Sequence, residues 1–314
     1  MRTLVNATEI LEKLPHRYEN IIVDEVACVQ DGETSQAELS VTLSAEDPAR
    51  AIFLRTLPSG EKIAITPIFM EILALASVIC TPKNAHQILI YAGISMFKKV
   101  HDLKAGEKAS GVVTRKRGRG VFINCEAQLY TADNHLVCTS ELTAALVDLT
   151  LLSQNDDTVA KRCLPLPIQT CDIAIDKPRY GKDLRMVVAD AIVHLAEDMI
   201  VTRYRYPEDH PFVQGHFPGN PIMMGVMQWM AVEDAFQAYA WHYYAAGNPV
   251  PENVTLEGTL IRADGAIVAE IKGYKARLNG ALFAELIETK KVIFREPLRP
   301  GETVFAVLTS IETL

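Results

Sequence analysis

Residues 210–226 contain the side chains that are best suited to catalysis. These seventeen residues include three glycines, three prolines and two histidines, and an apolar helical pattern begins directly after them. This composition predicts a tightly turned loop that brings a helix N-terminus to a fixed place. His216 lies inside the turn, and a neutral imidazole can accept a proton near neutral pH. We therefore expect His216 to act as a catalytic base.

A single carboxylic acid in the first half of the chain is the second candidate. Residues 65–80 are apolar on every face of a predicted helix, which should therefore be buried all round. Glu71 is the only charged residue in this helix. Because an unpaired buried carboxylate is costly, such a residue is paired, protonated or functional. Burial also raises the pKa of a carboxyl group, which suits a general acid.

Composition and charge limit the classes of partner. The chain has 314 residues, 49% hydrophobic and 22% charged, which is typical of a soluble globular protein. Its net charge of −8 argues against a nucleic-acid or anionic membrane surface as the main partner. No apolar run is long enough to span a membrane, and the first residues lack the apolar core of a signal peptide. None of the six cysteines forms a C-x-x-C pair, so we expect reduced, buried thiols in a cytoplasmic protein.

Period-two hydrophobic patterns follow the buried helix of the first half. They predict four strands, at residues 87–92, 107–115, 121–130 and 136–147. One buried helix followed by antiparallel strands is the pattern of an α+β domain whose sheet wraps the helix.

The second half repeats this plan. Strands are predicted at residues 184–193 and 199–206, and a long helix runs from about Gly225 to Tyr244, with more strands after it. Residues 294–302 echo residues 97–107, because each segment combines a strand end, a basic turn and Gly-Glu. A repeat of roughly 150 residues indicates a duplicated domain.

Two domains and a linker follow from this repeat. We expect an N-terminal domain at residues 1–150, a linker at 151–168 and a C-terminal domain at 169–314. The halves differ near their ends, because residues 255–289 carry extra strand patterns and few residues follow Leu308. The strand order of the second half is therefore expected to be rearranged.

Residues 211–227 resemble the signature loop and helix start of the β-hydroxyacyl-acyl-carrier-protein dehydratases of bacterial fatty-acid synthesis. The match is dense over these 17 residues, from Pro211 to Met227. Residues 14–26 look like the N-terminus of the same family, and residues 92–99 resemble one of its later strands. The resemblance thus touches both halves, and each half carries only part of it.

The resemblance implies a hot-dog fold, in which an antiparallel sheet wraps one long helix. Family members work as dimers, and each active site takes a His from one subunit and an acid from the helix of the other. A chain with two such halves is expected to be a tandem hot-dog that forms the pseudo-dimer within one polypeptide.

The two halves depart from the family pattern in complementary ways. In the family the helix carboxylate lies fourteen residues after the His, and here that position is Met230. In the first half Glu71 aligns with the family acid, and no His occurs between His16 and His86. An alignment anchored on Pro67 would place a leucine in the acid position, but the burial argument singles out Glu71. We expect one composite site of His216 and Glu71, and one dead site beside Met230.

The resemblance implies dehydration of a 3-hydroxyacyl thioester to a trans-2-enoyl thioester, in fatty-acid or related lipid or polyketide synthesis. His216 would take the proton from C2, and Glu71 would protonate the leaving hydroxyl. The backbone N–H of Gly225 is suited to stabilise the thioester oxygen, and Phe217 and Met230 are further candidates for substrate binding. No metal ion or cofactor is expected.

An acidic acyl carrier protein is the expected partner. Basic residues that are candidates for docking it are Lys98, Lys99, Arg115, Lys116 and Arg117, although such runs are often only solvated turns. The double unit is also a candidate for further oligomerisation. Two other functions stay open at this point: a hot-dog thioesterase that uses an acid to activate water, and a non-catalytic acyl-binding or assembly protein.

Overall fold

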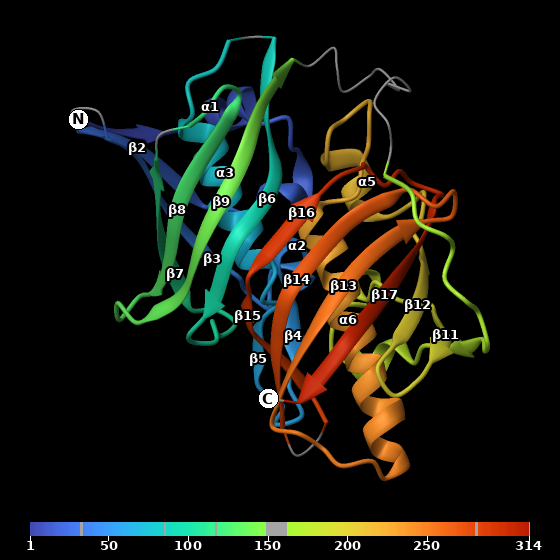
Figure 1. The fold of residues 1–314 in the computed structure, drawn as a ribbon. Coiled ribbons are helices and arrows are strands. Elements are labelled where there is room, and N and C mark those ends of the chain that lie inside the picture. The colour runs from blue at the N-terminus through green and yellow to red at the C-terminus, as the bar shows by residue number, and fades with distance from the viewer. Residues whose placement is uncertain (32–33, 85, 117, 149–161, 280–281, 314) are drawn as a thin grey trace.

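Two helices, α3 (Ile68–Cys80) and α6 (Gly225–Tyr243), each lie against one half of a long antiparallel sheet (Figure 1). The computed structural model describes residues 1–31, 34–84, 86–116, 118–148, 162–279 and 282–313. Each half is a hot-dog fold, since its sheet wraps one central helix, and the two halves lie side by side as a pseudo-dimer.

The first half of the sheet wraps α3. Its strands, in spatial order, are β1 (Arg2–Val5), β2 (Glu25–Asp31), β3 (Thr34–Thr42), β7 (Lys108–Arg115), β8 (Phe122–Thr131), β9 (Leu136–Asp148) and β6 (Gln87–Lys99). A separate pair is formed by β4 (Leu54–Thr56) and β5 (Lys62–Ala64). The short helices are α1 (Ala7–Lys13), η1 (Tyr18–Asn20) and α2 (Pro48–Ala51).

The second half of the sheet wraps α6. Its strands, in spatial order, are β15 (Ala284–Thr289), β14 (Ile267–Leu278), β13 (Asn253–Arg262), β17 (Thr303–Thr313), β12 (Ile200–Arg205), β11 (Ala191–Leu195) and β10 (Ile173–Ala174), and β16 (Lys291–Phe294) pairs with β14 and β6. The short helices are η2 (Lys177–Tyr180), η3 (Leu184–Met186), α5 (Pro211–Gly215) and η4 (Tyr244–Ala246).

Strand β6 joins the two halves. It pairs with β15 through Thr289 and Phe97, and with β16 through Val292 and Ile94. The ring of Phe97 also meets the ring of Trp229 on α6 edge-on, at 5.1 Å between centroids. Both helices and both half-sheets therefore contribute to one continuous apolar core, which fixes the orientation of α3 relative to α6.

The rearranged strand order that the sequence predicts is found in the second half. In the first half the hairpin β8–β9 comes after β6 and β7 in the chain, and it lies between them in the sheet. In the second half the hairpin β13–β14 lies between β16 and β17 but precedes both in the chain. The extra strand patterns at residues 255–289 thus include the hairpin β13–β14, which has the place in the second half that β8–β9 has in the first.

Other differences from the predicted elements are local. Residues 184–186 form the short helix η3, and the strand predicted at 184–193 begins only at Ala191. The predicted linker at 151–168 lies mostly outside the described residues, which resume at Arg162. Among the described helices, none combines the length and the apolar character that crossing a membrane requires.

The expectation that all cysteines are reduced is wrong for one pair. Cys28 on β2 and Cys80 at the end of α3 form a disulfide, with their Cα atoms 5.3 Å apart. Connectivity of this kind depends on distance in the fold, which cysteine spacing alone does not reveal. Cys125 and Cys138 are free thiols and are buried, as the sequence predicts for apolar strands.

Candidate active site

The loop that carries His216 is held in place by the first half of the chain. Helix α5 is capped by His210, whose Nδ1 accepts a hydrogen bond from the Phe212 N–H at 3.3 Å, and it ends at His216. The Arg17 N–H donates a hydrogen bond to the Gly215 carbonyl at 2.8 Å. A Cβ atom at Gly215 would lie 2.2 Å from the Arg17 carbonyl oxygen, so only glycine allows this contact.

The tautomer of His216 follows from its hydrogen bond. Its Nδ1 lies 2.8 Å from the Ile222 carbonyl oxygen, which can only accept, so Nδ1 carries the proton. The lone pair therefore lies on Nε2. Burial lowers the pKa of His216 to about 4. A neutral imidazole with a free Nε2 has the form of a general base.

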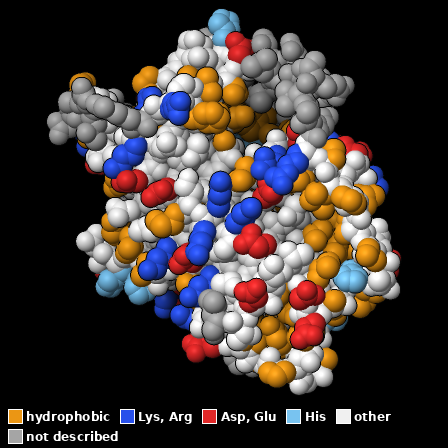
Figure 2. All heavy atoms as spheres, viewed as in Figure 1, with side chains coloured by type: hydrophobic (Ala, Val, Ile, Leu, Met, Phe, Trp, Pro, Cys, Tyr) orange, Lys and Arg blue, Asp and Glu red, His pale blue; other side chains and the backbone are white. Residues whose placement is uncertain are grey.

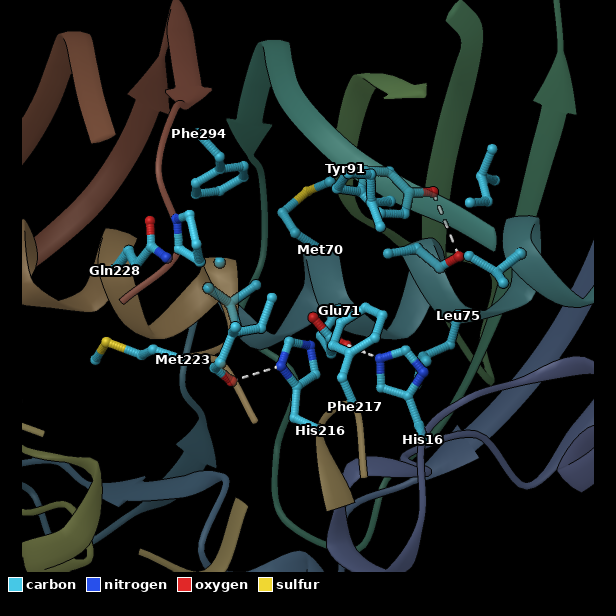
Figure 3. Close-up of a pocket in the computed structure, with 18 of the residues that line it drawn as sticks. His16, Met70, Glu71, Leu75, Tyr91, His216, Phe217, Met223, Gln228 and Phe294 are labelled. Atoms are coloured by element: carbon cyan, nitrogen blue, oxygen red, sulfur yellow. Dashed lines mark hydrogen bonds and ion pairs between the residues drawn. The ribbon is translucent and has the colours of Figure 1, made fainter. Parts of the chain in front are cut away.

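Glu71 lies in the first turn of α3 and is only 8% exposed. Burial raises the pKa of its carboxyl group to about 7. The helix begins at Ile68, with Pro67 at its cap position. From its first turn, Glu71 faces the space between α3 and the His216 loop (Figure 3). The geometry thus brings together Glu71 and His216, which come from opposite halves of the chain.

A third titratable residue, His16, lies at the same place. Its Nε2 is 3.9 Å from Glu71 Oε1, and its ring centroid is 5.0 Å from that of His216 (Figure 3). Burial and the nearby His216, Lys83 and Arg17 lower the pKa of His16 well below its usual value. His16 is not among the site residues that the sequence predicts. The signal that points to it is its place in residues 14–26, which share the family resemblance.

Among the described residues, His16, Glu71 and His216 are also the group whose donor atoms could hold a metal ion. One ligand atom from each lies within 4.8 Å of the others. Zinc bonds of about 2.1 Å would place tetrahedral ligand atoms about 3.4 Å apart. The 3.9 Å gap between His16 and Glu71 is wider than this. Metal binding would therefore need the side chains to move inward.

A cavity of about 240 Å³ lies around these three residues. Its first-half wall is apolar and includes Leu75, Val78, Leu89, Tyr91 and Leu142. Its second-half wall is formed by Gly225, Gln228 and Phe294, with Asn220, Arg295 and Arg299. In Figure 3, Tyr91 and Leu75 lie on one side of the histidines, and Phe294 and Gln228 on the other. The cavity is thus apolar on one side and carries polar and cationic groups on the other.

The predicted substrate-binding residues have different positions. Gly225, the first residue of α6, and Phe217 both line the cavity. Phe217 has a φ of 60° and packs edge-on against His216, at 4.6 Å between ring centroids. Met230 is fully buried and is not among the residues that line the cavity. Gln228, which sequence analysis did not select, is buried, and its Oε1 has no hydrogen-bond partner among the described residues.

A second cluster of titratable residues lies on the same helix as Met230. Glu233 and Asp234 are buried on α6, where Arg55 pairs with Glu233 at 2.6 Å and Lys182 with Asp234 at 2.6 Å. Lys182 also lies 3.7 Å from Glu233. Arg55 lies on β4 in the first half, and Lys182 follows η2 in the second half. We call these four residues the ion cluster.

The basic residues predicted for docking do not form one exposed set. Lys98, Arg115 and Lys116 are exposed, but Lys116 pairs with Glu126 at 2.7 Å. The assignment of Lys99 is wrong, because its buried ammonium pairs with Glu285 at 2.8 Å and with Asp102. Arg117 lies outside the described residues. None of the described members lines the cavity.

Figure 2 shows where cationic side chains gather on one face of the molecule, over the strands that join the two halves. Exposed lysines on these strands are Lys98 on β6, Lys272 on β14 and Lys291 on β16. Arg295 follows β16 directly and lines the cavity. The cationic surface thus continues to the second-half wall of the cavity.

Comparison with known proteins finds dehydratases. The family model of ApeI-like proteins, described as ApeI dehydratase, matches residues 193–250. The 3-hydroxyacyl-[acyl-carrier-protein] dehydratase FabZ of Lactococcus lactis subsp. cremoris is 30% identical over 149 residues, covering 45% of this chain and 95% of that protein. FabZ of Bacillus velezensis is 29% identical over 143 residues, covering 46% and 99%.

Solved structures that resemble the chain over most of its length are also dehydratase domains. One is that of PpsC from Mycobacterium tuberculosis in complex with C12:1-CoA, with a TM-score of 0.47, 11% identity, and coverage of 89% of this chain and 100% of that one. Another is the domain from the CurF module of Curacin polyketide synthase, with a TM-score of 0.48, 9% identity, and coverage of 94% and 98%.

Family membership rests on the sequence relatives. The L. lactis protein is 30% identical to this chain and is aligned over 95% of its own length. The chain therefore belongs to the FabZ family of 3-hydroxyacyl-[acyl-carrier-protein] dehydratases.

Proposed function

We propose that the chain dehydrates 3-hydroxyacyl thioesters to trans-2-enoyl thioesters at one composite site made of His216 and Glu71. The observation that carries the proposal is their position across one largely apolar cavity, with donor atoms within 4.8 Å. One comes from each half of the chain. A base and an acid at this spacing can act on adjacent carbon atoms of one substrate.

His216 is the base in this reaction. Its Nε2 lone pair takes a proton from C2 of the substrate, and the hydrogen bond from Nδ1 to the Ile222 carbonyl supports the positive charge that forms. Because burial holds its pKa at about 4, the imidazole is neutral and ready to accept a proton at pH 7. The C2–H electrons pass into the bond between C1 and C2, and the thioester oxygen becomes negative.

Glu71 is the acid. Its carboxyl group, with a pKa of about 7, gives its proton to the C3 hydroxyl as the C3–O bond breaks. The enolate electrons then form the C2–C3 double bond, and one water molecule leaves. The proton on His216 returns to Glu71 before the next turnover, so the sum of the reaction is loss of water.

The cavity wall supports the remaining requirements of the reaction. The N–H of Gly225 at the N-terminus of α6 can stabilise the negative thioester oxygen. The apolar wall around Leu75 and Val78 suits an acyl chain. Arg299 at the opposite wall, with Arg295, which also pairs with Glu270, suits the phosphate of a carrier arm, so we propose an acyl carrier protein as the substrate's carrier.

Location and assembly stay predictions. The sequence predicts a cytoplasmic location. The Cys28–Cys80 disulfide does not favour this location, because disulfides are rare in that compartment. Further association of the double hot-dog unit, and the division into domains 1–150 and 169–314, are likewise proposals.

The proposal is tested by offering a 3-hydroxyacyl thioester and following the 2-enoyl product. His216→Ala and Glu71→Gln should each reduce kcat by about 10²–10⁴-fold, because each removes one partner in proton transfer. The exposed His86→Ala is the matched control and should retain wild-type activity.

Other outcomes point to other functions. Undiminished turnover in both variants would show that the composite site is not the site of reaction. Release of a free thiol without enoyl product would indicate a thioesterase. Absence of turnover at every chain length, with retained binding of acyl thioesters, would indicate an acyl-binding protein.

A further inference from the structure

The gap between His16 and Glu71 has the size of a bridging oxygen atom. Nε2 and Oε1 are 3.9 Å apart, which is too long for a direct hydrogen bond. One oxygen atom can nevertheless lie about 2.8 Å from both, which is a normal hydrogen-bond distance. In the proposed dehydration the C3 hydroxyl oxygen must lie beside Glu71. The same oxygen is then within reach of His16.

The proton of His16 lies on the nitrogen that faces this gap. Its Nδ1 is buried and has no hydrogen-bond partner among the described residues. A proton on Nδ1 would therefore be a buried donor without an acceptor, whereas a proton on Nε2 points toward Glu71. Burial and nearby cationic groups keep the imidazole neutral, so it has one N–H to give.

The position of His16 is coupled to the loop that carries His216. The Arg17 guanidinium donates hydrogen bonds to the carbonyls of Leu14 at 2.7 Å and His16 at 2.6 Å. The Arg17 backbone N–H binds the Gly215 carbonyl at 2.8 Å. The same short segment thus carries His16 and contacts the residue next to His216. The segment that carries His16 is therefore attached to the loop that carries His216.

We propose that His16 is a third catalytic residue, whose Nε2–H donates a hydrogen bond to the C3 hydroxyl oxygen of the substrate as this oxygen leaves. The oxygen has two lone pairs, of which one takes the Glu71 proton and the other accepts the hydrogen bond from His16. The C3–O electrons go to the oxygen, water departs, and His16 neither gains nor loses a proton. This inference rests on the proposed dehydratase function.

A substrate with a different leaving group tests this assignment. A 3-chloroacyl thioester needs the base at C2, but chloride leaves without protonation. His16→Phe should reduce dehydration of the 3-hydroxyacyl thioester by about 10²-fold, as loss of one donor to a developing charge does in other enzymes. The same variant should eliminate chloride within a few-fold of the wild-type rate. Glu71→Gln should behave alike, and His216→Ala should lose both reactions.

Further variants separate hydrogen bonding from packing. His16→Gln keeps an N–H donor and should recover part of the dehydration rate that His16→Phe loses. The exposed His86→Phe is the matched control for the added phenyl group. Circular dichroism and thermal unfolding establish that each variant is folded.

The outcomes distinguish the inference from the proposed function. Wild-type dehydration by His16→Phe would overturn the role of His16 and leave the dehydratase intact. Loss of both reactions in a folded His16→Phe protein would also overturn it, because His16 would then only support the His216 loop. If the wild type eliminates chloride but never water, the proposed function itself fails.

Discussion

The cavity and the ion cluster both draw residues from the two halves of the chain, but they differ in ion pairing. The titratable groups of the ion cluster form close ion pairs, and those at the cavity do not. At the cavity, Arg17, which directly precedes η1, donates its backbone N–H to the carbonyl of Gly215 in α5. At the ion cluster, the carbonyl of Gly181, which directly follows η2, accepts a hydrogen bond from the N–H of Thr56 on β4 at 2.7 Å. The rings of Phe53 in the first half and Phe212 in the second half stack at 5.7 Å between centroids.

Both clusters draw their titratable side chains from the two halves of the chain. His16 lies two residues before η1 and Lys182 two residues after η2, and Glu71 and Glu233 lie on the two central helices. His216 follows α5, and Arg55 lies on β4. At the cavity, burial raises the pKa of Glu71 to about 7, lowers the pKa of His216 to about 4 and lowers the pKa of His16, whereas the ion cluster is held by close ion pairs.

This difference shows what separates a reactive site from a structural one. In the ion cluster every charged group has an opposite charge within 4 Å, and Asp234 also accepts the Val188 N–H at 2.8 Å. At the cavity, the nearest ion-pair partner of Glu71 is the neutral His16, at 3.9 Å, and both residues face an open volume together with His216. Removing one partner of a buried ion pair costs stability, whereas a titratable group without a close ion pair can act on a substrate.

The strongest test of this comparison replaces a glutamate by glutamine in the ion cluster and, separately, at the cavity. Glu233→Gln removes the partner of buried Arg55, so we expect it to lower the free energy of unfolding by about 3–5 kcal/mol while the folded protein keeps its activity. Glu71→Gln removes a carboxyl group whose nearest ion-pair partner is the neutral His16 at 3.9 Å, so it should reduce kcat by about 10²–10⁴-fold with little loss of stability. Urea denaturation and enoyl formation measure the two effects.

An exposed pair supplies the control for this prediction. Glu126 pairs with Lys116 at 2.7 Å, but both side chains are about half exposed. Glu126→Gln should therefore change stability by no more than about 1 kcal/mol. If Glu71→Gln proves as destabilising as Glu233→Gln, the distinction between a reactive and a structural cluster is lost.

The sequence predicts one side of this comparison better than the other. Glu71 was found because it is a lone charge in an apolar helix, and His216 because its loop is dense in glycine and proline. Met230 at the expected acid position led directly to the idea of two unequal sites. Each of these inferences uses residues that are neighbours in the chain.

Features that depend on contacts between distant segments were not predicted. His16 lies far from both other residues in the sequence, and only its place in residues 14–26, which share the family resemblance, points to it. Lys182 and Arg55 pair with residues of α6 from two distant segments, so the ion cluster is visible only in the folded chain. The sequence predicts Lys99 as a docking residue because its acid partner Glu285 belongs to the other half and cannot be paired with it from sequence.

The pH dependence sharpens the comparison further. His216 must be neutral and Glu71 must be protonated, so kcat/KM should fall by about tenfold per pH unit below about pH 4 and above about pH 7. Glu71→Gln should remove the alkaline decline, because no proton is then lost at that position. Glu233→Gln should leave both limits in place. An alkaline limit that survives in Glu71→Gln would assign the acid to another residue.

The smallest effect is expected where the two helices begin. Helix α6 starts with Gly225, which lines the cavity, whereas α3 starts with the fully buried Ile68. A Cβ atom at Gly225 would lie 2.9 Å from the Phe294 ring, so the ring must move for a larger residue to fit. Overpacking of this kind costs about 1–3 kcal/mol, and Gly225→Ala should lower kcat/KM by about tenfold.

A second substitution shows whether this loss comes from crowding at the cavity. Gly225→Ala combined with Phe294→Leu removes the ring atoms nearest the new methyl group and should restore part of the lost kcat/KM. Phe294→Leu alone is the control for loss of the ring. Recovery in the double variant would show that activity needs open space beside the N-terminus of α6. The N-terminus of α3, where Ile68 is the first residue, lacks such space. If the double variant is no better than Gly225→Ala, crowding by Phe294 is not the cause.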